Sequence, residues 1–228
     1  MPQPLGRREP TDWKHVERYP LYALAATPAK VPVVLGINWY SNFDRPEKVG
    51  HTYWIGRGDL GAIRGGHAIC ALPAGTYDRT AWWSFYDQGS EGACVGFACS
   101  RMMTLMNRRR YEARWLYREA QLIDEWSDTP PGEGTSVRAG CDILRLQGHR
   151  RTWGSRVHDV KPEEGIAENR WAVRWGEVRE ALGLPDSHDG VPLLNSWGRD
   201  YPHVVRLTDE AGERVLGEYG EACLVTDR

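Results

Sequence analysis

DQGSEGACVGFACSRMMTLM, residues 87–106, begins as a polar, turn-forming segment and continues as an apolar run. The apolar side chains of that run recur every three or four residues, which predicts a helix with one buried face. They are Val95, Ala98, Met102 and Leu105. Residues 108–110 then supply positive charges, which suit the C-terminal end of a helix dipole. The sequence therefore predicts a buried helix whose N-terminal end lies at or near Cys94.

Cys94 at the start of a helix has two interpretations. The unpaired N–H groups and the dipole at a helix N-terminus favour a thiolate over a thiol. Gln88 lies on the loop before it, and an amide donor at such a helix end can hold a developing oxyanion. A lone cysteine at a helix start is also often a small buried apolar residue. Spacing alone leaves both a nucleophile and a core thiol open.

The composition of the 228-residue chain is that of a globular protein, with 41% hydrophobic and 26% charged residues. Its net charge of −2 gives no indication of nucleic-acid binding. No stretch is apolar enough for a membrane span, and the first residues lack the apolar region of a secretory signal. We therefore expect a soluble, cytoplasmic, monomeric protein with neither nucleic acid nor a membrane as a partner.

The five cysteines are odd in number and lack a paired spacing, which favours reduced thiols. His67, Cys70, Cys94 and Cys99 have spacings loosely compatible with zinc. However, positions five apart on a helix diverge, so Cys94 and Cys99 are poor partners and we expect no metal or other cofactor. The basic segments 107–110 and 149–151 could contact phosphate, although basic residues at helix ends usually face solvent.

Two apolar segments each carry one polar residue. GGHAICAL places His67 on a predicted strand, where glycines such as Gly66 permit close approach of the backbone. A lone strand histidine is usually a core residue with satisfied hydrogen bonds. LLNSWG places Asn195 among leucine and tryptophan, where its amide needs a partner. An imidazole N–H would supply that partner, and Trp197 would cover the hydrogen bond from water.

DQGSEGACVGFA, GGHAICAL and LLNSWG together resemble the active-site motifs of papain-like cysteine peptidases. Residues 111–126 and 133–144 are similar to the helical lobe of bacterial and phage-type members, and GINWYSNF and GEACLVTDR to their other lobe. The resemblance implies an α+β, two-lobe fold with a helical lobe and an antiparallel β-barrel-like lobe. Glu91 stands where secreted members often carry a disulfide cysteine, so that bridge is not expected.

The resemblance also implies a thiol peptidase that hydrolyses peptide or protein substrates. Cys94 would attack the scissile carbonyl and His67 would transfer the proton. Asn195 would orient His67, and Gln88 would bind the oxyanion. The loop GEGTSVRAG resembles the wall of the main specificity pocket, which implies that Gly134 lies beside the substrate. Residues just before His67 would form the opposite wall. The side chain that is preferred, and the natural substrate, stay open.

The order of the motifs differs from the family, in which glutamine and cysteine precede histidine and then asparagine. Here His67 comes before Cys94, and no circular permutation relates the two orders. We expect either a transposed block or a helical lobe inserted between the histidine and asparagine strands. The expected parts are an N-terminal arm (1–30), a β lobe (31–78 and 189–228) and a helical lobe (79–188). An inactive peptide-binding module is the alternative if the site does not assemble.

The local patterns predict the remaining elements. Strands are expected at 31–40 and 66–72, with a hairpin around 53–55. Helices are expected at 111–126, from a cap at Ser136 to a stop at Gly148, and from Trp171 to near Gly183. The segments PLLNSW, HVVRL and EACLVT read as short strands.

Overall fold

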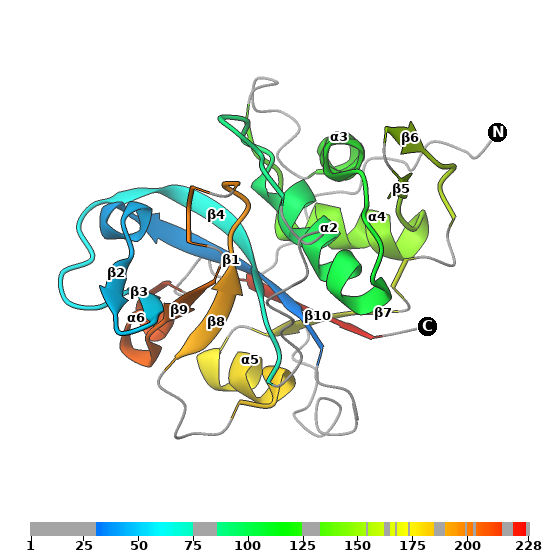
Figure 1. The fold of residues 1–228 in the computed structure, drawn as a ribbon. Coiled ribbons are helices and arrows are strands. Elements are labelled where there is room, and N and C mark those ends of the chain that lie inside the picture. Colours follow the sequence, from blue (N-terminus) through cyan, green and yellow to red (C-terminus); the bar gives the residue numbers. More distant parts are fainter. Residues whose placement is uncertain are drawn as a thin grey trace.

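A mostly antiparallel sheet runs through the middle of the molecule (Figure 1). The computed structural model describes residues 31–74, 86–124, 133–153, 155–161, 165–166, 168–172, 174–184, 190–198, 200–202, 204–215 and 221–226. The strands of the sheet are β1 (Val33–Tyr40), β2 (Glu47–Val49), β3 (Thr52–Ile55), β4 (Ile63–Ala71), β7 (Glu168–Ala172), β8 (Val191–Leu194), β9 (Val205–Leu207) and β10 (Glu221–Thr226). A separate hairpin joins β5 (Thr152–Trp153) and β6 (Arg156–Val157).

Within the described residues the strand order is β2-β3-β9-β8-β4-β1-β10-β7. The neighbouring strands β3 and β9 run parallel to each other. The edge strands β2 and β7 are not paired with each other there. The sheet is therefore open, and the expectation of a barrel-like closure is wrong. The expectation that strands of VPVVLGINW, GHAICAL and PLLNSW share one sheet is confirmed, because β1 pairs with β4 and β4 pairs with β8.

Helices cover both faces of this sheet. They are η2 (Ser41–Asp44), α2 (Cys94–Asn107), α3 (Ala113–Ile123), α4 (Val137–Leu146), α5 (Trp175–Leu182) and α6 (Asp209–Val215). Val33 and Leu35 of β1 belong to a buried core with α5 and α6, whereas Val34 belongs to a core with α2, α3 and α4. Because neighbouring side chains on a strand point to opposite faces, the sheet separates two helical layers (Figure 1).

The local helix signals are largely confirmed. The helix α2 begins at Cys94, as its apolar period predicts. Ser136 caps α4, since its Oγ accepts a hydrogen bond from the N–H of Ala139 at 3.1 Å. Gly183 ends α5 in the left-handed conformation, with φ +62°.

Two local predictions are wrong. Trp171 lies in β7, opposite Cys223 of β10, so the helix begins only at Trp175. Trp171 has a helical spacing from Trp175, but the pairing of its strand with β10 at the edge of the sheet determines its conformation. The segment between HVVRL and EACLVT was expected to be a polar turn, but it contains the helix α6. The arm at 1–30 lies outside the described residues, as do most residues of the linkers expected at 73–80 and 184–190. None of the described helices has the length and apolarity needed to cross a membrane.

Candidate active site

Cys94 is the first residue of α2 and is half-buried. The N–H of Phe97 donates to the carbonyl of Ala93 at 3.2 Å, and no side chain caps this helix start. N–H groups of the first helical turn are therefore free to face a negative charge. Burial raises the pKa of the Cys94 thiol, but the hydrogen bond and charge of His67 together with backbone hydrogen bonds lower it, so that the net shift is downward. The result favours a thiolate.

His67 on β4 is buried and makes a hydrogen bond to Asn195, with 2.8 Å between Nε2 and Oδ1. The backbone N–H of Ser196 donates to the same Oδ1 at 2.8 Å, which identifies that atom as the amide oxygen. Since an amide oxygen only accepts, Nε2 of His67 carries the proton. The second ring nitrogen, Nδ1, is therefore the one that can accept a proton. His67 acts on Cys94, since it contributes to the lowered pKa of the thiol.

The sheet brings these residues together from distant parts of the chain. The strands β4 and β8 pair at Cys70 with Leu194 and at Ala71 with Leu193. Asn195 follows β8 directly, and His67 lies earlier on β4, 128 residues away in sequence. The contact predicted from the two apolar segments is therefore confirmed. The order of the motifs does not prevent their assembly.

Aromatic rings enclose the imidazole of His67. The centroid of Trp39 on β1 lies 4.7 Å from it and that of Trp197 lies 5.4 Å from it. The two indoles also contact each other at 5.0 Å, and Tyr201 packs on Trp197 at 5.1 Å. Trp197 thus packs on the histidine of the His67–Asn195 pair, and its role in shielding that hydrogen bond from water stays a prediction. Trp39 was missed as a site residue, although its alternation with Ile37 on β1 places it on that face.

Gln88 is buried and held in place at both its backbone and its side chain. Its backbone N–H donates to the carbonyl of Ser196 at 2.9 Å, and its Nε2 donates to the carbonyl of Glu91 at 3.1 Å. The second hydrogen of Nε2 is left for another acceptor. The N–H of Gly198 also donates to the carbonyl of Tyr86 at 3.2 Å. The loop before α2 therefore lies alongside the segment that follows Asn195.

Arg101 provides a second connection between α2 and the asparagine segment. It is fully buried, and its Nη1 donates to the carbonyl of Asn195 at 2.8 Å. The guanidinium also lies 5.7 Å from the centroid of the Tyr86 ring. Sequence reasoning missed this role. The signal was a charged residue within an apolar helical run, which needs a buried partner.

Gly134 lies next to the loop that precedes Cys94. A Cβ added to Gly92 would come within 3.1 Å of the Gly134 nitrogen, so the two backbones are in close contact. Gly134 has φ +98°, and a Cβ built on it meets nothing within 4 Å. Its N–H donates to the Tyr117 hydroxyl at 3.2 Å. Gly134 thus presents open backbone on the Cys94 side of the site, where a substrate wall was expected.

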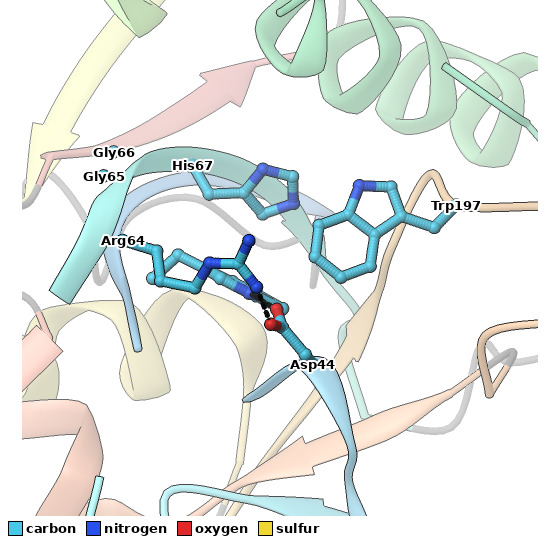
Figure 2. Close-up of a pocket in the computed structure, with 7 residues that line it drawn as sticks. Asp44, Arg64, Gly65, Gly66, His67 and Trp197 are labelled. Carbon is cyan, nitrogen blue, oxygen red and sulfur yellow. Dashed lines mark hydrogen bonds and ion pairs between the residues drawn. The ribbon is translucent and has the colours of Figure 1, made fainter. Parts of the chain in front are cut away.

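A cavity of about 420 Å³ lies beside His67 (Figure 2). Its lining residues are Trp39, Asp44, Arg64, Gly65, Gly66, His67 and Trp197. Arg64 and Asp44 form an ion pair within it. Two residues expected near the substrate, Gly66 and Trp197, line this cavity together with the histidine.

All five cysteines lie within the described residues and are free thiols. The described part of the chain contains no group of three or more residues suited to hold a metal ion. His149, weighed as part of a phosphate-binding segment, is fully buried, with its ring stacked on Tyr111 at 4.7 Å. A phosphate contact by His149 is therefore ruled out in this conformation.

Comparison of the chain with protein-family models, with curated proteins and with solved structures finds no match. The functional interpretation accordingly rests on the motifs and on the geometry of the site.

Proposed function

We propose that this protein is a thiol-dependent peptidase with a papain-like two-lobe arrangement. One observation carries the proposal: His67, which hydrogen-bonds to Asn195, lowers the pKa of the Cys94 thiol. A nucleophile, a base oriented toward it and a group that orients the base are the parts that covalent hydrolysis requires. In this proposal α2, α3 and α4 form one lobe, and the open sheet with α5 and α6 forms the other.

The proposed reaction begins when Nδ1 of His67 takes the proton of the Cys94 thiol and the sulfur attacks the scissile carbonyl carbon. The carbonyl oxygen takes up the negative charge, which the backbone N–H of Cys94 and Nε2 of Gln88 stabilise. His67 then donates its Nδ1 proton to the leaving amine, and the C–N bond breaks. A water molecule attacks the resulting thioester while His67 accepts its proton, and the acid product leaves Cys94. Asn195 keeps Nε2 protonated throughout.

Hydrolysis of casein and of a peptidyl fluorogenic substrate tests this proposal. Cys94→Ala and His67→Ala are each expected to lower kcat by on the order of 10⁴-fold or more. Asn195→Ala is expected to lower it less, because Asn195 orients a reacting group and does not react. His158→Ala is the matched control, since His158 is an exposed histidine outside the site, and it should leave kcat unchanged.

Turnover by Cys94→Ala at the wild-type rate would end the proposal. Binding of peptides by the wild-type protein without turnover would favour the inactive peptide-binding module. The proposed partner is a peptide or protein chain, and the cytoplasmic location and monomeric state stay predictions.

A further inference from the structure

The cavity beside His67 contains the ion pair between Arg64 and Asp44, and the two side chains use different shares of their hydrogen-bonding groups. Both oxygens of the Asp44 carboxylate accept a hydrogen bond, Oδ1 from Nε1 of Trp39 at 2.9 Å and Oδ2 from Arg64. Arg64 uses only Nη1 in hydrogen bonds to the described residues. A guanidinium has five N–H donors in a planar fork. The guanidinium of Arg64 therefore keeps unused donors in the cavity.

The positions of the two side chains make those donors accessible. Figure 2 shows the Arg64 guanidinium reaching from β4 to Asp44, with the rings of His67 and Trp197 beside it. The side chain of Arg64 is 59% exposed. Asp44 thus holds the guanidinium in place without covering it. Asp44 also fixes the indole of Trp39, so the cation and an aromatic wall have a defined relative position.

Part of the cavity wall is backbone. Gly65 and Gly66 line the cavity, and a Cβ built on either meets nothing within 4 Å. The volume of about 420 Å³ is within the range of small-ligand sites and is large enough for an amino-acid residue. The absence of side chains at both positions leaves this space open.

The proposed reaction indicates which part of the substrate would enter the cavity. His67, which lines it, is the group that donates a proton to the leaving amine in the proposed function. Cys94 and Gly134, which face the acyl part of the substrate in that proposal, do not line it. A residue that begins with the leaving amine must therefore start at the imidazole and extend into this space.

We propose that this cavity binds the residue on the leaving side of the scissile bond and selects one that carries a carboxylate, through Arg64. The inference rests on the proposed function and adds a substrate class to it. The carboxylate can come from an aspartate or glutamate side chain, or from the free C-terminus of a leaving residue. A planar guanidinium recognises both in the same way.

Quenched peptides that share one acyl part test the proposal. Their leaving residues would be Glu, Gln and Lys within a longer peptide, and Ala as a terminal residue with a free or an amidated carboxyl group. For the wild type we expect kcat/KM to be roughly three- to thirtyfold higher for Glu than for Gln. The ratio of free to amidated terminal Ala shows whether a C-terminal carboxylate is also accepted. Both ratios should decrease as salt is added.

Variants identify the residue responsible. Arg64→Ala should reduce the Glu-to-Gln ratio to about one, and Arg64→Glu should reverse the preference toward Lys. Arg57→Ala is the matched control, because Arg57 is a similarly exposed arginine paired with Glu47 outside the cavity. It should leave both ratios unchanged.

The outcomes separate this inference from the proposed function. Cleavage of all the peptides at equal rates would overturn the selection by Arg64 and leave the peptidase proposal standing. If no peptide is cleaved, equilibrium binding of the same peptides to Cys94→Ala decides. A carboxylate preference that depends on Arg64 would then support the cavity assignment alone, and equal binding would overturn it.

Discussion

Asn195 determines which nitrogen of His67 faces the sulfur. The backbone N–H of Ser196 fixes the amide oxygen, and that oxygen requires a proton on Nε2. Nδ1 is therefore the nitrogen without a proton in this tautomer. A histidine on an apolar strand would otherwise be assigned to the core. What indicates a role for His67 in the site is the set of residues that it contacts. Those partners could be predicted from LLNSWG only because a buried amide needs a hydrogen bond.

Gln88 is expected to contribute to turnover and not to substrate binding. If Nε2 donates to the oxyanion, Gln88→Ala lowers kcat by on the order of 10²–10³-fold, or about 2.7–4 kcal/mol, with little change in KM. Steady-state kinetics on a fluorogenic peptide measures both constants. Gln147→Ala provides the control, because Gln147 is a half-buried glutamine at the end of α4. A change confined to KM would instead make Gln88 a substrate-positioning residue.

His149 gives the fold a dependence on pH. Burial lowers the pKa of His149 from 6.5 to about 3. The Ser100 hydroxyl donates to the Gly96 carbonyl, so it accepts from Nε2 of His149 at 2.7 Å. Nδ1 has no hydrogen-bond partner among the described residues. Nothing described therefore stabilises a proton on Nδ1, and the folded protein keeps this ring neutral.

The direction of the change in stability follows from the difference in the pKa of His149 between the folded and the unfolded chain. Below pH 6.5 the unfolded chain binds a proton at His149 that the folded chain does not, so the free energy of unfolding falls as the pH falls toward 3. We expect a loss of roughly 2 kcal/mol between pH 7 and pH 5 from this group. Urea unfolding of the wild type and of His149→Gln, which cannot titrate, measures it. Equal slopes with pH for the two proteins would contradict the assignment.

At the scale of the element, helix ends could be predicted from the sequence where the groups that determine them are close in sequence. The start of α2, the cap of α4 and the end of α5 all depend on residues within one turn. The strand β7 could not be predicted, because its pairing with β10 is a contact between distant segments. Trp171 has a helical spacing from Trp175, and tertiary pairing decides its conformation.

A substitution at Ser136 tests directly whether a local side-chain cap stabilises α4. Its Oγ satisfies one of the free N–H groups at the start of α4, so Ser136→Ala should lower the free energy of unfolding by about 1 kcal/mol. Ser136→Thr should restore most of the loss. Urea denaturation is the measurement, and Ser155→Ala, at an exposed position, should change stability by less than about 0.5 kcal/mol. A loss as small as that of the control would show that the cap contributes nothing.

At the scale of the whole molecule, the unusual order of the motifs is accommodated by contacts between distant segments. The segment that contains Cys94 follows β4 and precedes β8, although β4 and β8 are neighbours in one sheet. Closing a long connection costs little more than closing a short one, since the entropy grows with the logarithm of length. Arg101 and the backbone of Gln88 then tie the intervening segment to Asn195 and Ser196.

The sequence was sufficient for the residues of the candidate site and insufficient for what supports them. Cys94, His67 and Asn195 each stand in a recognisable local pattern. Trp39, Arg101 and Arg64 do not, because their roles follow from which strands and helices are neighbours. The openness of the sheet is likewise a property of all its strands together, so no local pattern distinguishes it from a barrel.

The central claim is that Cys94 is an activated nucleophile assembled with His67, and the chain carries its own control. Cys70 is also a free thiol, but burial raises its pKa to about 12. The pKa of Cys94 is lowered through His67, so its thiolate persists to lower pH than that of an ordinary thiol.

The most direct measurement is the rate of iodoacetamide labelling at each cysteine of the folded protein at pH 6, resolved by peptide mass spectrometry. We predict rapid labelling of Cys94, negligible labelling of Cys70, and a marked slowing at Cys94 in His67→Ala. Labelling of Cys94 that is as slow as that of Cys70, or that is unaffected by His67→Ala, would contradict the account.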